Sequence, residues 1–243
     1  MRHPPPLPPW LPAWMGSQGI ALWGVAGLEG LGAPTDEEGR PFPRAIAWGV
    51  PMNPEIMARI SRGPDRPYAN EYVRVNRRLD EAAGWLAEEV RCRGGRARVL
   101  LASERSDPAG VRGDFPHKTA ATRAGLGWIG RNAQLVTRAF GPWLRLGTVF
   151  TDLELPCGAP VESDRCGTCR LCVEACPAGA LTGSGWRVGL SREALLDVHA
   201  CDAWKHEHYA QYNHGHNCGI CAAVCPYGRQ QLRGPATGRG PGA

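Results

Sequence analysis

The residues with the clearest chemistry are ten cysteines, eight of which lie between positions 166 and 225. The first four follow the spacing C-x2-C-x2-C-x3-C and precede a proline: Cys166, Cys169, Cys172 and Cys176. In this run three thiolates bind three corners of one [4Fe-4S] cluster, and the fourth binds a second cluster. Zinc sites pair two C-x2-C units across a longer loop, so the spacing favours iron–sulfur clusters over zinc.

A second cysteine run lies near the C-terminus and repeats this spacing without its first cysteine. It consists of Cys218, Cys221 and Cys225, with a proline directly after it. In two-cluster ferredoxins the last cysteine of each run binds the cluster of the other run. This exchange assigns Cys225 to the first cluster and Cys176 to the second.

The second cluster then needs one more ligand. Cys201 is the favoured residue, directly after the helix-like segment SREALLDVHA. Three histidines are alternatives, although histidine is the less common ligand: His199, His214 and His216. Eight thiolates for two [4Fe-4S] clusters is the simplest count, and we expect Cys92 and Cys157 to be ordinary reduced thiols.

A glycine-rich segment, AGLGWIGRN at residues 124–132, carries the spacing G-x-G-x-x-G. This spacing binds a dinucleotide only where a strand enters the turn and a helix follows it. Here a predicted helix at 117–124 comes before the glycines and a predicted strand comes after them. The order is reversed, so the sequence argues against a nicotinamide or flavin dinucleotide site.

Several stretches together resemble epoxyqueuosine reductases, which are related to reductive dehalogenases. They are FPHKTAATRAGLGWIGRN, LGTVFTDLEL, CGTCRLCVEACPAGAL and CGICAAVCP, and the resemblance runs from about Ile20 to Arg229. It implies an α+β fold, in which a nitroreductase-like cobalamin-type domain precedes a ferredoxin-like double [4Fe-4S] cluster domain. It also implies an oxidoreductase whose clusters pass electrons to cobalamin. The alternatives are a non-catalytic, ferredoxin-like electron carrier and a regulatory or RNA-associated protein with structural clusters.

The resemblance also implies a role for the glycine segment. Glycines would let the backbone approach a flat corrin ring closely, because a Cβ would clash there. The residues expected to bind the cofactor are Gly125, Gly127, Trp128, Gly130 and Asn132. The alternative is a tight turn with a tryptophan in the protein core.

A proton donor is the next implied residue, since the family uses an aspartate in an Asp-Tyr-His stretch. The nearest match here is Glu71-Tyr72-Val73, and Glu71 would act if burial raised its pKa. The alternative is a glutamate placed in a first helical turn by the helix dipole. His117 and Lys118 either bind an anionic cofactor tail or substrate, or form a solvated helix start.

The partners implied are an electron donor such as flavodoxin or ferredoxin, and transfer RNA. Full-length members carry a C-terminal helical-repeat domain that helps to hold transfer RNA. This sequence ends soon after the cluster domain, so we expect a short form, and a transfer RNA substrate stays open.

Hydrophobic periodicity outlines the elements that would position these residues. Alternation and spacing predict strands at 45–50 and 97–102, a long helix at 68–90, and paired strands at 133–137 and 144–150. The proline-rich residues 1–14 and the tail 231–243 are expected to be disordered. Between them we expect a nitroreductase-like domain at 15–156 and a double-cluster domain at 157–230.

The composition limits the classes of protein to which this sequence can belong. The chain has 243 residues, a net charge of +5 and a hydrophobic share of 43%, which is ordinary for a globular protein. The apolar runs are shorter than the roughly 18 residues of a membrane span, and the N-terminus does not match a signal peptide. A cytoplasmic location is therefore expected, where clustered cysteines bind metal more often than they form disulfides.

Overall fold

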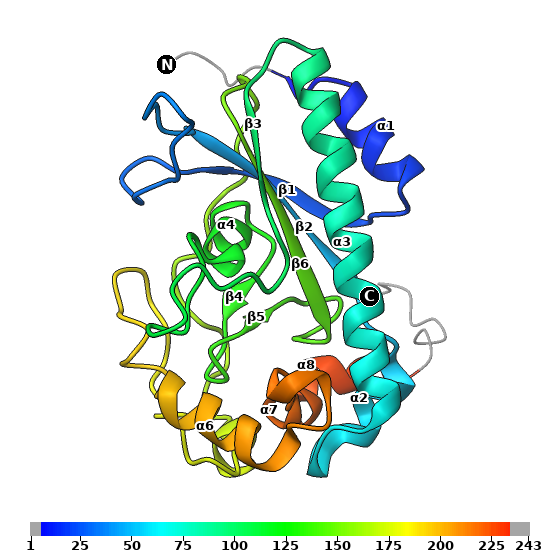
Figure 1. Ribbon diagram of the computed structural model, residues 1–243, viewed down its shortest axis with the longest axis vertical. Coiled ribbons are helices and arrows are strands. Elements are labelled where there is room, and N and C mark those ends of the chain that lie inside the picture. Colours follow the sequence, from blue (N-terminus) through cyan, green and yellow to red (C-terminus); the bar gives the residue numbers. More distant parts are fainter. Residues whose placement is uncertain (1–5, 234–243) are drawn as a thin grey trace, which may run out of the picture.

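The computed structural model describes residues 6–233 and is built around one four-stranded antiparallel sheet (Figure 1). The strands lie in the order β1-β2-β6-β3. Their bounds are Leu22–Gly27 for β1, Arg44–Pro51 for β2, Ala97–Leu100 for β3 and Leu144–Thr151 for β6. Each neighbouring pair is antiparallel, which agrees with the mixed α and β fold that was expected.

Both faces of the sheet are apolar, because the central strand β2 is buried on both sides. Ile46, Trp48 and Val50 belong to one core cluster, while Ala45 and Ala47 belong to another on the opposite face. This alternation follows from the period of two along a strand. The sheet therefore needs a helical layer on each side.

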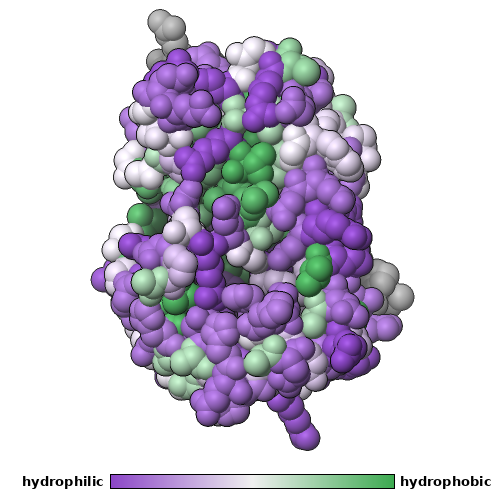
Figure 2. Space-filling model, in the orientation of Figure 1, coloured by the Kyte–Doolittle hydropathy of each residue, from purple (hydrophilic) through white to green (hydrophobic). Residues whose placement is uncertain are grey.

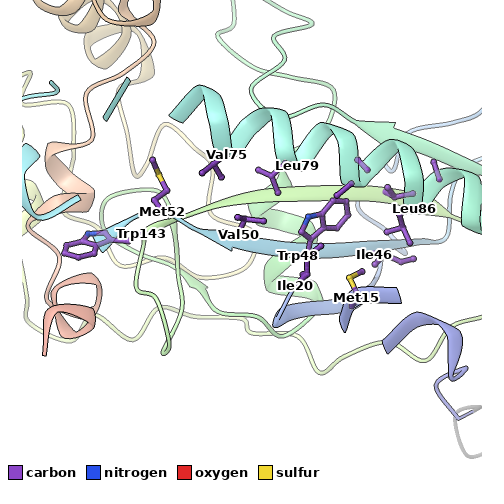
Figure 3. Packing of buried hydrophobic residues seen from close by; sticks show 14 of the residues in the cluster. Met15, Ile20, Ile46, Trp48, Val50, Met52, Val75, Leu79, Leu86 and Trp143 are labelled. Atoms are coloured by element: carbon purple, nitrogen blue, oxygen red, sulfur yellow. The ribbon is translucent and has the colours of Figure 1, made fainter. Parts of the chain in front are cut away.

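Helix α3 (Arg66–Cys92) covers the first face and presents a continuous apolar stripe to it. Figure 3 shows Val75, Leu79 and Leu86 pointing from α3 toward the strands. The helix begins where the side chain of Asp65 accepts a hydrogen bond from the backbone N–H of Tyr68. The helix predicted at 68–90 is confirmed, with slightly wider bounds.

Helix α4 (His117–Arg123) covers the second face, against β1, β2 and β6. It packs with Phe115, Phe150 and the small side chains of β2 into the second core cluster. Gly125, in the left-handed conformation at φ +79°, ends this helix. The helix-before-glycine order predicted from the sequence is thus confirmed.

The N-terminal helix α1 (Trp10–Ser17) corrects the prediction that residues 1–14 are disordered. Leu11 and Met15 are fully buried in the first core cluster. Pro12 does not prevent the helix, because it lies in the first turn, where its missing N–H costs nothing. Residues 1–5 lie outside the described part of the chain.

The remaining elements lie mainly in the lower part of the molecule in Figure 1, where they hold the cysteine runs. They are short: α2 (Pro54–Arg59), η1 (Ile60–Arg62), α5 (Leu171–Glu174), α6 (Val198–Tyr209), η2 (Asn213–Gly215), α7 (Ile220–Ala223), α8 (Pro226–Arg229) and η3 (Gln230–Leu232). The disordered tail was predicted to begin at 231, but Gln231 donates a hydrogen bond to the carbonyl of Phe140. Residues 234–243 lie outside the described part.

Two predicted elements differ from the structure. The segment 133–137 was expected to pair with 144–150, but β5 (Leu135–Val136) pairs with β4 (Trp128–Ile129) instead. Strand β6 is already occupied on both edges, by β2 and β3. The segment SREALLDVHA is largely non-helical, because α6 starts at Val198, where Asp197 caps it.

No helix among residues 6–233 is long and apolar enough to cross a membrane.

Candidate metal centres and the adjoining cavity

The thiols gather in two sets, of which the first surrounds Cys172. Burial, together with the neighbouring thiols of Cys225, Cys166 and Cys169, raises the pKa of Cys172 to about 11. These are the four cysteines that the exchange rule assigns to the first cluster. We call them the first set.

The second set surrounds Cys221. Burial raises the pKa of this thiol well above its usual range, and Cys218, Cys201, Cys172 and Cys176 add to the effect. Cys201 and Cys176 also act on the thiol of Cys218. The structure therefore brings Cys201 together with Cys176, Cys218 and Cys221, which we call the second set.

Short helices position both sets. Cys172 lies in the single turn of α5, and Cys221 lies in the single turn of α7, so the two runs have the same local structure. Cys201 lies in the first turn of α6 rather than after a helix. Among residues 6–233, no three Cys, His, Asp or Glu side chains form a group that could hold a single metal ion. Eight thiols in two wider groups match the donor chemistry of two cubane clusters.

A cavity of about 430 Å³ lies between the sheet part and the cysteine runs. All four thiols of the second set line it, and none of the first set does. Its other walls come from both parts of the chain, with Met52, Leu144 and Leu146 on one side and Leu181 and Ile220 on the other. Figure 2 shows a face of the molecule that is hollowed near its centre, with hydrophobic residues gathered above the hollow.

His117 lines this cavity as a neutral, fixed side chain. Its Nδ1 lies 2.8 Å from the hydroxyl of Thr148, and its Nε2 lies 3.2 Å from the carbonyl of Leu101. Burial, together with the charge of Arg145, lowers its pKa to about 4. The imidazole is therefore uncharged at neutral pH, and it is not part of a solvated helix start.

Lys118 lines the cavity next to it. Its Nζ donates a hydrogen bond to the carbonyl of Ala133 at 2.8 Å. Burial lowers the pKa of the ammonium to about 8, and the charge of Arg192 contributes. Within residues 6–233 Lys118 forms no ion pair with a carboxylate, so its charge is available to a ligand in the cavity.

Tyr72 and Arg145 form a second polar group in the cavity wall, which the sequence analysis did not identify as a site. The guanidinium of Arg145 lies 4.1 Å from the centroid of the Tyr72 ring, and the Tyr72 hydroxyl lies 2.9 Å from that of Ser103. Burial opposes ionisation of the phenol, but Arg145 and Ser103 outweigh it and lower its pKa. The sequence feature that could have indicated this group was Arg145, a charged residue inside the largely apolar strand β6.

Glu71 does not reach the cavity. It is buried, and its carboxylate accepts hydrogen bonds from the backbone N–H of Asn53 at 2.9 Å and from the guanidinium of Arg74. Burial opposes ionisation, but these bonds outweigh it and hold the pKa below its usual range. The proton-donor hypothesis required a raised pKa, so the geometry supports a structural carboxylate that fixes the start of α2.

The glycine segment also lies mostly outside the cavity, whereas the corrin hypothesis required it to line the cofactor site. Of its five predicted cofactor residues only Asn132 lines the cavity. A Cβ on Gly127 would lie 2.2 Å from the carbonyl oxygen of Val136, and one on Gly125 would lie 2.7 Å from that of Ala159. These glycines therefore allow close approach to the protein's own backbone, as the tight-turn alternative stated.

Trp128 and its neighbours instead contact the thiols. Trp128 is 2% exposed, and its indole N–H lies beside the first-set thiol of Cys166, whose pKa it lowers against the effect of burial. A Cβ on Gly130 would lie 3.6 Å from the sulfur of Cys166. Gln134 donates a hydrogen bond to the sulfur of Cys221 at 3.6 Å. Cys92 and Cys157 are exposed and belong to neither set.

Comparison with known proteins agrees with this geometry. The family described as "4Fe-4S double cluster binding domain" matches residues 165–228, which include all eight clustered cysteines. Epoxyqueuosine reductase of Listeria monocytogenes is 35% identical over 48% of this chain and 31% of the relative. The enzyme of Synechococcus is 32% identical over 77% of this chain and 52% of the relative. The chain thus spans between about a third and a half of the length of these two relatives.

Solved structures share the fold at lower identity. A catabolic reductive dehalogenase in complex with 3-bromo-4-hydroxybenzoic acid superposes with a TM-score of 0.68 at 23% identity, over 89% of this chain and 31% of that protein. Epoxyqueuosine reductase superposes with a TM-score of 0.57 at 18% identity, over 90% of this chain and 65% of that protein. The resemblance predicted from the motifs is therefore confirmed: the chain is similar to epoxyqueuosine reductases and carries their double [4Fe-4S] cluster domain.

Proposed function

We propose that the chain is an iron–sulfur oxidoreductase of the epoxyqueuosine reductase type, in which two [4Fe-4S] clusters pass electrons to an acceptor in the cavity. One observation carries this proposal: the four second-set thiols line the same cavity as Tyr72, His117, Lys118 and Arg145. The second cluster would deliver electrons into the cavity. The first cluster, whose thiols do not line it, would receive them from a donor such as flavodoxin or ferredoxin.

The acceptor that we propose is a corrinoid. We further propose that the part of the chain built on the sheet is of the nitroreductase-like type. The cavity has the apolar walls that suit a macrocycle, while Lys118, Asn132 and Arg145 suit its polar periphery. The enclosed volume of about 430 Å³ is smaller than a whole corrinoid, so this ligand would extend into the hollow of Figure 2. When bound, the corrinoid supplies a strongly reducing metal, and the protein supplies position and protons.

Protons in the cavity would come from Lys118 or Tyr72 rather than from Glu71. The ammonium of Lys118 has a pKa of about 8, so at neutral pH it is charged and close to the range suited to a general acid. Thr148 and the carbonyl of Leu101 hold the ring of the neutral His117 in place. The substrate that the names of the relatives suggest is epoxyqueuosine in transfer RNA.

The cluster assignment is tested by metal analysis after anaerobic reconstitution. We expect about eight iron and eight sulfide per chain, as two cubanes require. Cys201→Ala should lower the iron content to about half, because it removes one second-set ligand. Cys157→Ala is the matched control and should leave the iron content unchanged. An iron content of about half the expected value in the parent protein, or zinc in stoichiometric amount, would contradict the assignment.

The acceptor is tested separately by titrating the reconstituted protein with cob(II)alamin under anaerobic conditions. We expect saturable binding that weakens in Lys118→Met while the iron content stays the same. Reduced protein and corrinoid are then incubated with transfer RNA containing epoxyqueuosine, and the nucleosides are analysed by mass spectrometry. Clusters without corrinoid binding would favour the electron-carrier alternative, and corrinoid binding without conversion would indicate another substrate.

A further inference from the structure

The β4–β5 hairpin, residues 128–136, contacts both sets of thiols. Its first part lies beside Cys166 of the first set, and its last part reaches Cys221 of the second set. Neither strand carries a cysteine, so these contacts come from outside the cysteine runs. The corrin hypothesis assigned this segment to cofactor binding, which does not account for its contacts with the thiols.

Trp128 supplies the contact with the first set. Its ring packs edge-on against Tyr227 at 5.0 Å between centroids, which fixes its orientation. Within residues 6–233 its buried indole N–H has no hydrogen-bond acceptor, and Cys166 packs against the core cluster that contains Trp128. A buried donor without an acceptor is costly, so a nearby anionic sulfur is its natural partner.

Arg131 follows Gly130 in the loop between β4 and β5. The Arg131 side chain holds this part of the loop, because its guanidinium donates to the carbonyls of Gly167 and Gly183. Gly130 lies next to the sulfur of Cys166, since a Cβ there would stand in ordinary van der Waals contact with it, at 3.6 Å. This part of the loop therefore packs against the first-set thiol.

Gln134 supplies the contact with the second set, through its side-chain amide and the sulfur of Cys221. The other N–H groups beside the thiols belong to the cysteine runs themselves. Ile220 provides one next to Cys218, and Tyr227 and Gly228 provide two next to Cys225. The side chains of Trp128 and Gln134 thus add one donor to each set that the cysteine runs do not provide.

An N–H donor to a cluster sulfur stabilises the more negative, reduced cluster more than the oxidised one. We propose that Trp128 raises the reduction potential of the first cluster through Cys166, and that Gln134 raises that of the second through Cys221. The two potentials are then set independently from one hairpin. This inference rests on the two-cluster assignment proposed above and adds how electrons are distributed between the clusters.

The test is a potentiometric titration of the reconstituted protein, followed by electron paramagnetic resonance. Trp128→Phe keeps an aromatic ring but removes the donor, and Gln134→Met keeps the length of the side chain but removes its amide. At a fixed potential we expect the reduced-to-oxidised ratio of one cluster to fall about tenfold, as for the loss of one hydrogen bond to a charged group. Trp128→Phe should affect the first cluster and Gln134→Met the second.

Trp48→Phe is the matched control. Trp48 is also fully buried with an indole N–H that meets no acceptor within residues 6–233, but it lies in the sheet core. It should change neither potential. The signal that disappears in Cys201→Ala identifies the second cluster. Unchanged potentials in both loop variants at full iron content, or equal shifts of both clusters in each variant, would overturn the proposal.

A second measurement covers the case in which Trp128→Phe loses iron. In the parent protein exchanged into D2O, pulsed electron paramagnetic resonance of each reduced cluster should detect an exchangeable deuteron from the donor. Gln134→Met should remove one such coupling from the second cluster only. Absence of any exchangeable coupling beyond those of the cysteine runs would refute the donor role while leaving the iron content, and hence the cluster assignment, intact.

Discussion

Two parts of this protein are stabilised by different forces. We call the part built on the four-stranded sheet the sheet part, and the part that holds the cysteine runs the cluster part. The sheet part buries large side chains on both faces of β2 and β6, among them Trp48, Phe150 and the stripe of α3. In the cluster part, the helices α5, α7 and α8, which adjoin clustered thiols, are single turns, and α5 contains no buried residue. Apolar burial stabilises the first by about 25 cal/mol per Å² of apolar surface, whereas the second depends on ligand–metal bonds.

The difference shows why the β4–β5 hairpin matters. It belongs to the sheet part by its position in the chain, yet Trp128, Ile129 and Val136 form a core cluster with Trp186 and Leu195 of the cluster part. Trp143 makes a similar connection, since its indole N–H donates to the carbonyl of Ala222 at 2.8 Å. The cluster part is therefore fixed to the sheet part at a few residues beside the thiols.

The largest effect is expected on removal of iron. Chelation should expose the amides of α5, α7 and α8 to hydrogen exchange, because each is a single turn that carries or directly follows a cluster ligand. The amides of α3, β2 and β6 should stay protected. Hydrogen–deuterium exchange with mass spectrometry compares the two regions directly, and equal protection of both after iron removal would show that the cluster part folds without metal.

A smaller effect is expected from Gly127→Ala, at the junction of the two parts. The new Cβ would meet the Val136 carbonyl oxygen at 2.2 Å, so β4 and β5 must separate. We expect a loss of about 1–3 kcal/mol in the free energy of unfolding, as in overpacked cores. Gly84→Ala, on α3 with no atom within 4 Å of its Cβ, is the control and should be neutral or stabilising. Thermal denaturation of both variants gives the comparison, and unchanged stability in Gly127→Ala would contradict the packing argument.

A third effect is expected from pH. The pKa of His117 is lowered to about 4 in the folded protein, from a usual value of 6.5. Between these values the unfolded chain binds more protons, so stability is present above pH 6.5 and is lost as the pH falls toward 4.

His117→Gln should flatten this part of the pH profile of the melting temperature. Parent and variant are measured by differential scanning fluorimetry between pH 4 and 7. Parallel profiles would show that His117 is not buried in its neutral form.

The metal centres could be predicted from the sequence because their chemistry is local. The spacing of Cys166, Cys169 and Cys172 lets consecutive thiols turn toward one cluster, whatever surrounds them. The long helix was equally predictable, since one face of 3.6-residue periodicity must be buried. The identity of the fourth second-set thiol, Cys201, followed by counting ligands.

The cavity, the role of the glycine segment and the environment of Glu71 were decided by tertiary structure alone. The cavity joins β6, α4 and the second cysteine run, which are far apart in the chain, so no local pattern predicts it. The pKa of Glu71 is lowered by hydrogen bonds from Arg74 and from the backbone N–H of Asn53, 18 residues away, which together outweigh burial. The glycines permit close approach in any context, but only the fold determines that Gly127 approaches the Val136 carbonyl rather than a cofactor.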